Sequence, residues 1–539
     1  MPETTVPYDR PRRRFWPKGV PHGLDYPDVP LFELLARTAA RRPDSIAFSC
    51  GDRKLSYRRL DRASALLAAH LHKVGVGRGA RIILALPNSL EFVISYYGIL
   101  KAGATVCPSN PMYKAEELGY QVKDAGAVGV ITDAAGYEKV KQFRAQTAFK
   151  SIILAGEAPE GADSLADILR KRSSALGGPI AALRPGEDIA AIVYTGGTTG
   201  FPKGAMLTHR NLVANAMQNA AWFNWTHADV IMGVLPFYHS WGGSTCINSP
   251  IFAGARVVVL PRFDAEDLLS AIQREKATVL YGAASMFITL LASPLLPQYD
   301  LSSLRYVKAG AMPVPPEVKE RWEQATGVTM VTGYGLSEAS PEACNSPPER
   351  VKPGAIGFPI IDTDARIVDQ ETGTIDLPAG AVGELIIRGP QVMKGYLNRP
   401  DENRDTLRDG WLYTGDLGFV DDEGYLHVVD RKKEIIKYKG YTIAPAEVEA
   451  ALYEHPAVLE CAVIGKPDDL AGEVPKACVV LRDGCSATAE ELIRFCENKV
   501  AAYKRVREVE FVSEIPKTAV GKVLRRVLRD RERTRQTSS

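Results

Sequence analysis

One segment of the chain has the composition of a phosphate-binding loop. Residues 194–204 (YTGGTTGFPKG) contain four glycines, three threonines and one lysine. Glycines let backbone N–H groups approach an anion closely, threonine hydroxyls donate further hydrogen bonds, and lysine adds a mobile positive charge. The segment is not a Walker loop, because its lysine does not follow a glycine and precede Ser or Thr. We therefore expect a phosphate site formed by Thr195, Gly196, Gly197, Thr198, Thr199, Gly200 and Lys203.

A second glycine-rich segment competes with this interpretation. Residues 75–80 (GVGRGA) satisfy the dinucleotide fingerprint G-x-G-x-x-[GA]. However, the apolar spacing predicts a helix before them, over residues 55–74, and a strand after them, over residues 80–86. Pyrophosphate binding at a helix N-terminus requires the reverse order. Residues 75–80 are therefore interpreted as a turn from a helix to a strand.

The segments around these loops predict a layered α/β body. A second helical pattern covers residues 89–101, and short apolar runs without strict alternation resemble buried parallel strands. These runs cover residues 128–132, 151–154, 189–194 and 257–260. From about residue 355, short segments among Gly, Pro and Asp suggest antiparallel strands at residues 365–369, 383–388 and 424–429. The prediction is two α/β layered subdomains plus a distorted antiparallel β subdomain, all within residues 1–429.

A smaller unit follows a charged connector at residues 430–433. Its pattern predicts helices over residues 446–454 and from Ala489, with strands over residues 459–464 and 477–481. We expect residues 434–539 to form a small α+β C-terminal domain. The tail from Lys522 to Arg535 is rich in arginine but also contains Asp530 and Glu532, which favours a solvated terminal helix over nucleic-acid binding.

Composition narrows the class of protein. The chain has 539 residues, of which 45% are hydrophobic, with 66 Lys and Arg against 64 Asp and Glu and a net charge of +2. The balance of charge argues against a protein that coats nucleic acid or an anionic membrane, and the apolar content argues against disorder. The length predicts two to four domains with a large core. We expect a large globular enzyme.

The cysteines and termini predict a compartment. The eight cysteines are scattered without a C-x-x-C pair, which is typical of reduced thiols in a cytoplasmic protein. The N-terminus is polar and rich in Pro and Arg, with no secretory signal, and no segment approaches the ~20 apolar residues of a membrane span. We expect at most peripheral membrane contact, and a monomer or homodimer.

The phosphate loop and six further motifs carry a family resemblance. In their order along the chain they resemble the adenylate-forming superfamily of acyl-CoA synthetases, aryl-CoA ligases, firefly-type luciferases and peptide-synthetase adenylation domains. The resemblance covers nearly the whole chain. The six motifs are residues 235–242 (LPFYHSWG), 308–313 (KAGAMP), 332–338 (TGYGLSE), 411–418 (WLYTGDLG), 430–440 (DRKKEIIKYKG) and 516–522 (PKTAVGK).

The resemblance implies a reaction in two steps. A carboxylate attacks the α-phosphate of Mg-ATP to give acyl-adenylate and pyrophosphate, and a thiol, usually that of coenzyme A, then displaces AMP. The first step brings anions together, so its site needs positioned cations and hydrogen-bond donors. By the resemblance, Lys522 bonds both carboxylate and phosphate and serves adenylation only, and Glu338 holds Mg²⁺. A single carboxylate suits Mg²⁺, which keeps several of its waters.

The resemblance also assigns the nucleotide and coenzyme A sites. Ser337 is expected to donate to the α-phosphate, and Asp416 and Arg431 to contact the ribose. Lys433 matches a hinge between the two half-reactions. The backbone at Gly333, Tyr334 and Gly335 is expected to line the adenine, Lys437 to lie near AMP, and Lys439 and Gly440 to bind coenzyme A. Thr442 departs from the glutamine that is common at this position in the aryl branch.

The acid-binding site is expected around residues 235–242 and 308–313. By the resemblance, His239 is a catalytic-site residue that borders the carboxylate, and Trp241 lines or gates an acyl tunnel. Gly310 and Ala311 are expected to lie beside the nucleotide and form the tunnel wall, where small residues leave volume, and Leu336 completes the pocket.

These assignments predict an acid–thiol ligase that uses ATP, Mg²⁺ and coenzyme A. The leading hypothesis is a ligase for a medium- or long-chain fatty acid, and the alternative is an aryl-CoA ligase of the 4-coumarate kind, favoured by residues 437–440 (KYKG). A luciferase-type oxygenase lacks support from any residue, and a carrier-protein adenylation domain is disfavoured because no carrier module follows Lys522. An inactive nucleotide-binding scaffold would be expected to have lost Lys522 or Glu338, and both are present.

Overall fold

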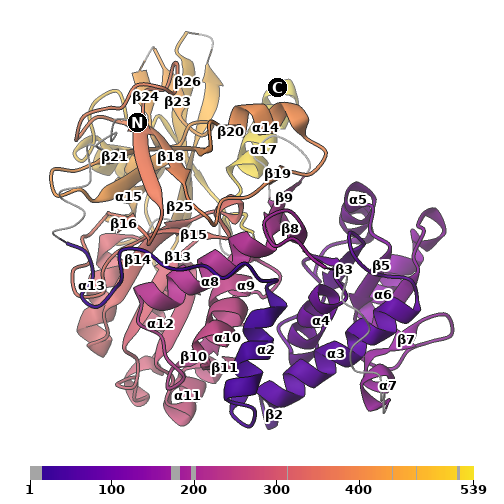
Figure 1. The fold of residues 1–539 in the computed structure, drawn as a ribbon. Coiled ribbons are helices and arrows are strands. Elements are labelled where there is room, and N and C mark those ends of the chain that lie inside the picture. The colour runs from indigo at the N-terminus through magenta and orange to yellow at the C-terminus, as the bar shows by residue number, and fades with distance from the viewer. Residues whose placement is uncertain are drawn as a thin grey trace, which may run out of the picture.

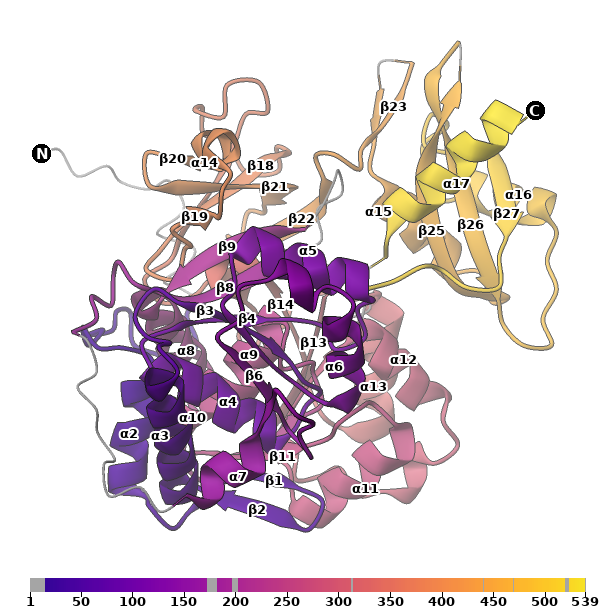
Figure 2. The ribbon, with the colours of Figure 1, turned by 90° about the vertical axis from the view of Figure 1, so that its right-hand side faces the viewer.

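A computed structural model describes residues 15–171, 182–195, 202–311, 314–439, 441–468, 470–518 and 523–538 of the protein. A large body ends with strand β22 (Leu426–Arg431), and a smaller C-terminal unit begins with strand β23 (Ile436–Tyr438) (Figure 1). The smaller unit stands to one side above the body (Figure 2).

The first sheet of the body has nine strands. Its central strands run parallel, and antiparallel strands flank them at both edges. The order is β16 (Phe358–Pro359), β15 (Glu342–Asn345), β14 (Met330–Gly335), β13 (Tyr306–Gly310), β12 (Val279–Ala283), β10 (Val230–Gly233), β11 (Arg256–Val259), β1 (Ile46–Cys50) and β2 (Arg53–Ser56). Helices α11 (Ala265–Glu275), α12 (Ala284–Ala292) and α13 (Pro316–Thr326) pack on its outer face in one apolar cluster.

The second sheet has eight strands and carries the end of the predicted phosphate loop. Its order is β19 (Gly395–Tyr396), β9 (Lys203–Thr208), β8 (Ile189–Thr195), β4 (Thr105–Pro108), β3 (Arg81–Ala85), β5 (Gly129–Thr132), β6 (Ser151–Leu154) and β7 (Asp163–Ser164). Helices α5 (Ala115–Ala125) and α6 (Ala134–Lys141) cover its outer face, and α7 (Leu165–Arg170) contacts β7 and α3.

A shared core joins these two sheets. The largest apolar cluster combines strands of both sheets with the helices between them. These helices are α2 (Phe32–Arg41), α3 (Tyr57–Lys73), α4 (Leu90–Lys101), α8 (His209–Trp222) and α10 (Ser249–Ala253). The body is therefore a layered α/β structure, as the sequence predicts.

The remaining two sheets are mainly antiparallel. In the body, β17 (Asp364–Val368), β18 (Gly383–Arg388), β21 (Trp411–Val420) and β20 (Leu407–Arg408) form one sheet, β22 pairs with β21, and α14 (Pro400–Thr406) lies beside them. In the C-terminal unit the order is β24 (Tyr441–Ile443), β23, β26 (Gly472–Leu481) and β25 (Val458–Asp468), with β27 (Glu508–Phe511) parallel to β26. Helices α15 (Pro445–Tyr453), α16 (Ala489–Glu497) and α17 (Arg525–Ser538) complete it.

The structure corrects the sequence analysis at two places. The predicted helix over residues 55–74 begins only at Tyr57, because residues 53–56 pair with β1 as β2 and the Ser56 side chain accepts a hydrogen bond from the Arg59 amide (3.3 Å). Strand β8 is parallel only to β4, since its other neighbour, β9, runs antiparallel. Residues 75–80 lie in the turn between α3 and β3, as expected.

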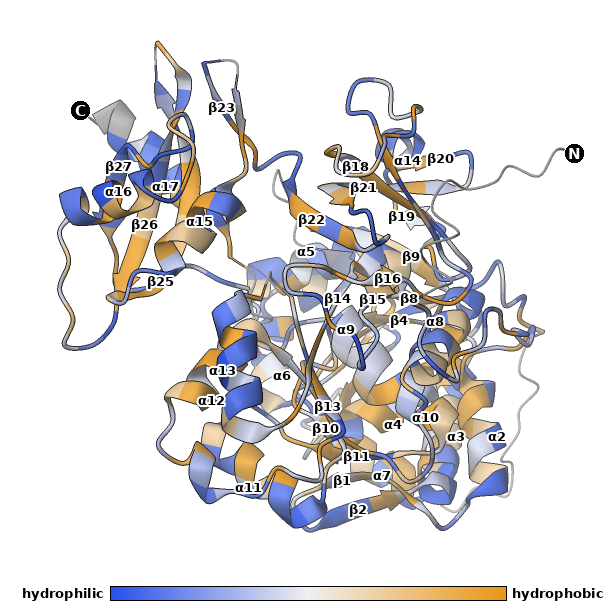
Figure 3. Ribbon diagram, turned by 90° about the vertical axis from the view of Figure 1, so that its left-hand side faces the viewer, coloured by the Kyte–Doolittle hydropathy of each residue, from blue (hydrophilic) through white to orange (hydrophobic). Residues whose placement is uncertain are grey.

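The hydropathy of the helices and strands differs with their position in the fold. Strands β25 and β26 are largely hydrophobic, and α11 and α13 carry hydrophilic residues on part of their surface (Figure 3). Within the described part of the chain, no helix combines the length and the apolar character that crossing a membrane requires.

Candidate active site

Several of the predicted site residues lie where the nine-stranded sheet meets the antiparallel sheet of the body. Strands β13 and β14 are parallel neighbours, so their carboxyl ends lie at the same edge. Gly310 ends β13 and Gly335 ends β14. Side chains that follow these strands therefore face a common space, which is the usual position of ligand sites in open α/β sheets.

A buried carboxylate joins two of the predicted nucleotide-binding motifs. Asp416 in β21 accepts a hydrogen bond from the Tyr334 hydroxyl (2.5 Å) and forms an ion pair with Arg431 (Nε–Oδ1 2.9 Å). Asp416 and Arg431 are register partners in the antiparallel pair of β21 and β22. The charge of Asp416 raises the pKa of the Arg431 guanidinium, whereas burial and then Asp416 raise the pKa of the Tyr334 hydroxyl. The Arg431 guanidinium and the Tyr334 hydroxyl therefore both keep their protons at neutral pH.

The predicted metal ligand Glu338 lies one short turn beyond this cluster. It occupies the 3-10 helix Ser337–Ala339, accepts a hydrogen bond from the Tyr396 hydroxyl (Oε1, 2.6 Å), and its carbonyl accepts one from the Met393 amide (2.8 Å). Among the residues that the structure describes, no three His, Cys, Asp or Glu side chains form a metal cluster. One carboxylate fits Mg²⁺, which uses few protein oxygens when phosphate oxygens and water supply the rest.

Lys203 brings positive charge to the same place. Its ammonium group lies 5.5 Å from the centre of the Tyr396 ring and forms an ion pair with Glu402. Burial, followed by the positive charges of Lys433 and Arg399, lowers the pKa of Lys203, and Glu338 opposes this. Lys203, which begins β9, therefore lies within electrostatic reach of Glu338 and of the predicted hinge residue.

Ser337 and His239 connect Glu338 to an internal cavity. The Ser337 hydroxyl lies 2.9 Å from the Ser240 hydroxyl, at the start of the short helix α9 (Ser240–Gly243). His239 precedes this helix, and its Nδ1 accepts a hydrogen bond from the Trp241 amide (3.2 Å). The cavity lies between β8, β9 and the α9 region, and its lining residues are Tyr96, Pro108, Ala191, Val193, Leu207, Leu212, Phe237, Tyr238, His239, Ser240, Gly243, Ser244, Asn248 and Ser340.

The other predicted acid-site residues lie outside the lining of this cavity. Trp241 packs directly against Gly310, where an added Cβ would come within 2.9 Å of the indole Cη2. Ala311 follows with a positive φ of 68°. Leu336 is half-buried, and its amide donates to the Pro341 carbonyl (3.0 Å). His239 thus lines the cavity, whereas the ring of Trp241 packs against the end of β13.

Comparison with known proteins identifies the family of the chain. Residues 35–397 match the AMP-binding enzyme family, and residues 447–522 match the AMP-binding enzyme C-terminal domain. The chain belongs to the AMP-binding enzyme family. The resemblance predicted from the seven motifs is therefore confirmed.

Individual relatives of this AMP-binding enzyme include ligases for aliphatic and aromatic acids. It is 40% identical to a long-chain-fatty-acid–CoA ligase of Bacillus subtilis (strain 168), covering 96% of this chain and 97% of the relative. It is 37% identical to 4-coumarate–CoA ligase 5 of Oryza sativa subsp. japonica, covering 93% and 94%. Its fold resembles the anthranilate CoA ligase AuaEII in complex with anthranoyl-AMP (TM-score 0.88, 31% identity, 95% and 98% covered). The predicted fold class is confirmed as well.

Several predicted residues of this AMP-binding enzyme do not reach the site in the conformation described. Lys437 and Lys439 are exposed. The Lys437 amide donates to Glu473 (2.8 Å), and the Lys439 amide donates to the Ala471 carbonyl (2.8 Å), so both belong to the C-terminal unit. Figure 2 shows the β23 end of that unit projecting away from the body. Gly196, Gly197, Thr198, Thr199, Gly200, Gly440 and Lys522 lie outside the described residues.

Two contributors to the site were missed by the sequence analysis. Tyr396 binds Glu338 although 58 residues separate them, and it is brought there by the pairing of β19 with β9. Glu342 is buried, and its carboxylate accepts a hydrogen bond from Nε1 of the predicted acid-site residue Trp241 (3.0 Å). A buried glutamate in a strand between apolar neighbours is the only signal that could have indicated it.

Proposed function

We propose that this AMP-binding enzyme is an acid–thiol ligase that converts a carboxylic acid to its acyl-CoA in two steps. In the first step, a carboxylate oxygen of the acid bonds to the α-phosphorus of ATP, and the bond to the bridging oxygen breaks, so pyrophosphate leaves. In the second step, the sulfur of coenzyme A bonds to the acyl carbon, AMP leaves with its oxygen, and the thiol proton passes to solvent. The observation that carries the proposal is the convergence of Tyr334, Asp416 and Arg431 with Glu338 at the end of β14.

The residues of this cluster have distinct roles in the proposal. Asp416 accepts hydrogen bonds from the ribose hydroxyls, and Arg431 holds the Asp416 carboxylate in place while contacting the ribose. Glu338 would hold Mg²⁺, which supplies positive charge to the phosphate oxygens when bound. Lys203 and the loop before it bind phosphate, and Ser337, positioned by Ser240, donates to the α-phosphate. These groups stabilise the negative charge that develops during adenylation.

We place the hinge at residues 430–433, between units 1–429 and 434–539. Arg431 pairs with Asp416 of the body, whereas Glu434 pairs with Arg529 of α17 in the C-terminal unit (3.0 Å). The chain therefore passes from one unit to the other between these two ion pairs, where Lys433 is exposed. Rotation here would bring Lys522 to the site for adenylation, and Lys437, Lys439 and Gly440 for transfer to coenzyme A.

We propose a medium- or long-chain fatty acid as the substrate. The cavity beside His239 is largely apolar, with Val193, Leu207, Leu212 and Phe237 in its wall. The similarity to the fatty-acid ligase of Bacillus subtilis supports the same choice. An aryl-CoA ligase is the second candidate, because Tyr96, Ser244 and Asn248 give the same cavity polar groups that a phenolic acid could bind.

The test is a panel of carboxylic acids offered to the full chain with ATP and Mg²⁺. Saturated acids from hexanoate to palmitate are compared with benzoate and 4-coumarate, and pyrophosphate release is measured with and without coenzyme A. We expect release with fatty acids, and acyl-CoA detected by mass spectrometry only when coenzyme A is present. An Asp416→Ala variant gives the background rate of pyrophosphate release. Activity with aromatic acids alone would select the second candidate, and no activity with any acid would refute both.

A further inference from the structure

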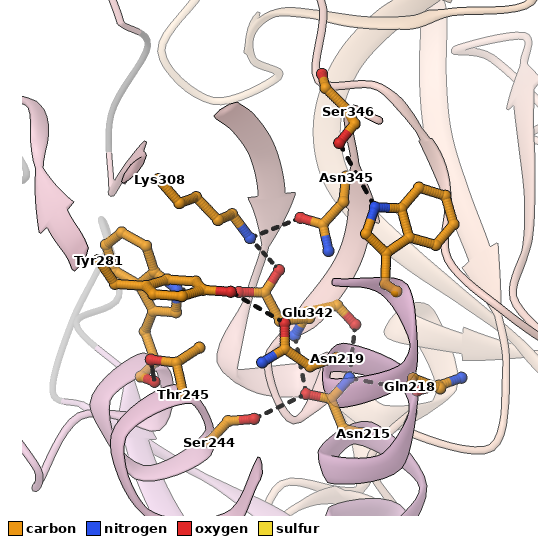
Figure 4. Close-up of polar contacts among 12 residues, drawn as sticks. Asn215, Gln218, Asn219, Ser244, Thr245, Tyr281, Lys308, Glu342, Asn345 and Ser346 are labelled. Carbon is orange, nitrogen blue, oxygen red and sulfur yellow. Dashed lines mark hydrogen bonds and ion pairs between the residues drawn. The ribbon is translucent and has the colours of Figure 1, made fainter. Parts of the chain in front are cut away.

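A buried ion pair lies directly behind Trp241. Lys308 in β13 and Glu342 in β15 pair with each other, and their side chains are only 3% and 2% exposed. Figure 4 shows both charges inside a cluster of amides and hydroxyls contributed by α8, β12 and β15. Neither residue has a role in the nucleotide site described above.

Stability alone does not explain this pair. Two charges taken out of water carry a large desolvation penalty, and well-packed apolar residues are often equally or more stable in their place. Burial lowers the pKa of Lys308, and Glu342 opposes this. Lys308 also donates to the Asn345 amide oxygen (2.6 Å) and lies 5.5 Å from the centre of the Tyr281 ring. Both charges of the pair therefore have polar partners. Because stability does not explain the pair, we consider which other side chains it holds in position.

The Glu342 carboxylate binds the indole of Trp241. One oxygen pairs with Lys308, and the other accepts a hydrogen bond from Trp241 Nε1 (3.0 Å). The backbone of Glu342 is fixed on both sides by Asn215, whose oxygen accepts from the Glu342 amide (3.2 Å) and whose nitrogen donates to the Glu342 carbonyl (2.8 Å). The acceptor for the indole is thus held at a fixed position (Figure 4).

The position of the indole in turn determines how much space is left at the end of β13, next to the residues that line the cavity. Trp241 covers Gly310 so closely that a Cβ there would lie 2.9 Å from the ring. It also makes an edge contact with Tyr281, with ring centres 6.0 Å apart. Trp241 follows His239 and Ser240, which line the cavity. The ring therefore fills the volume that the small residue at the end of β13 leaves free.

We propose that Glu342, neutralised by Lys308, is a positioning residue that holds Trp241 against Gly310 and thereby limits the size of the carboxylic acid that the enzyme accepts. The proposal rests on the acid-activating function proposed above. Without the carboxylate, the indole N–H loses its buried acceptor and the ring is free to leave Gly310. Larger or branched acids then gain space, while the nucleotide site keeps its residues.

The test removes the Lys308–Glu342 pair that holds Trp241, without leaving one of the two charges buried and unpaired. A Lys308→Met/Glu342→Leu double variant removes both charges and keeps the indole, whereas Trp241→Phe removes the indole N–H and also makes the ring smaller. In the double variant, we expect the ratio of kcat/KM for large acids to kcat/KM for small acids to rise by about tenfold. In Trp241→Phe, this ratio should change in the same direction. In both variants, KM for ATP should change by less than about twofold. In the Trp241→Phe background, adding the double substitution should produce no further shift in this ratio.

Controls separate a positioning role from general destabilisation. Arg305→Met removes an ion pair with the buried Asp229 (2.7 Å) at the opposite end of β13, and its acid preference should match the wild type. The inference is overturned if Arg305→Met shifts the preference equally, or if folded Trp241→Phe keeps the wild-type preference. A wild-type enzyme that is inactive with every acid would refute the proposed function and this inference together. An active wild type with the same profile as the double variant would refute this inference alone.

Discussion

The Tyr334 hydroxyl donates a 2.5 Å hydrogen bond to the Asp416 carboxylate, although 82 residues separate the two positions. This contact ties the end of β14 to β21, and therefore joins the nine-stranded sheet to the antiparallel sheet of the body. Because Asp416 also pairs with Arg431, the strand that leads into the hinge is connected to the same carboxylate. One carboxylate thus connects the two sheets to the strand that precedes the C-terminal unit.

Asp416→Asn tests the ribose-binding role. The amide keeps the size of the side chain but loses the charge that accepts ribose hydroxyls and holds Arg431. Since hydrogen bonds to charged groups contribute about 1.5–3 kcal/mol each, KM for ATP should rise by about 10- to 100-fold. Tyr334→Phe keeps the carboxylate and removes one donor, so its KM for ATP should rise only about threefold. Steady-state kinetics with varied ATP would contradict the assignment if the two variants were equally impaired.

Glu338→Gln tests the proposed metal site. Loss of the carboxylate charge should lower the rate of adenylation by about 100-fold and raise the Mg²⁺ concentration needed for half-maximal rate. Tyr396→Phe removes only the donor to Glu338 Oε1 and should shift the Mg²⁺ dependence by about threefold. The measurement is pyrophosphate release at fixed ATP and varied Mg²⁺.

Tyr413→Phe is the matched control for the metal experiment. The Tyr413 hydroxyl donates to the Gly373 carbonyl (2.7 Å) within the antiparallel sheet, away from Glu338. Its Mg²⁺ dependence should equal that of the wild type. A Glu338→Gln variant with normal Mg²⁺ dependence would exclude Glu338 as the ligand.

Lys522→Ala separates the two half-reactions. The proposed role of Lys522 is confined to adenylation, so the variant should lose pyrophosphate release by at least about 100-fold. It should still form acyl-CoA from synthetic acyl-adenylate and coenzyme A at nearly the wild-type rate. Lys517→Ala is the control from the same motif, because Lys517 pairs with Glu460 within the C-terminal unit and should leave both half-reactions intact. Equal loss of both half-reactions in Lys522→Ala would refute the role.

The sequence predicted those parts of the site that lie within single motifs. Glu338, Ser337 and Tyr334 come from one short segment, and the resemblance of that segment to a family motif was sufficient to propose them together. The predicted strand boundaries also match the structure where a short apolar run is bounded by turn residues. Residues 151–154 and 383–388, predicted as strands, are strands β6 and β18 with the same bounds. Local patterns succeed here because strand length and turn residues are local properties.

Contacts between distant strands were not predictable in the same way. The sequence placed a strand over residues 424–429, whereas β22 covers Leu426–Arg431, and this shift concealed the pairing of Arg431 with Asp416 in the adjacent strand. Tyr396 reaches Glu338 only through the pairing of β19 with β9. The Glu342–Trp241 contact likewise depends on how α9 packs on β15. Register and packing between elements decide such contacts, and single-sequence patterns do not contain them.

Lys476→Met tests how helix α17, which follows Lys522 in the sequence, is held in the C-terminal unit. Lys476 in β26 is buried and pairs with Glu508 (2.7 Å), Glu510 (2.9 Å) and Glu532 of α17 (2.6 Å). Breaking a buried pair and leaving a charge behind costs about 3–5 kcal/mol, so α17 should open more readily. Hydrogen exchange of the amides in α17 at pH 7 should accelerate strongly relative to the wild type.

The effect of Lys476→Met should depend on pH. Burial alone would raise the pKa values of Glu508 and Glu510, but hydrogen bonds from Lys466, Lys476 and Arg535 lower both. A carboxyl group with a lowered pKa in the folded state stabilises the fold above its ordinary pKa of about 4.3, and this contribution is lost as the pH falls. The difference between variant and wild type should therefore shrink below about pH 4. Lys504→Met removes the more exposed pair with Glu447 and should change exchange little at either pH. Equal protection of α17 in Lys476→Met and wild type at pH 7 would show that this cluster does not hold the helix.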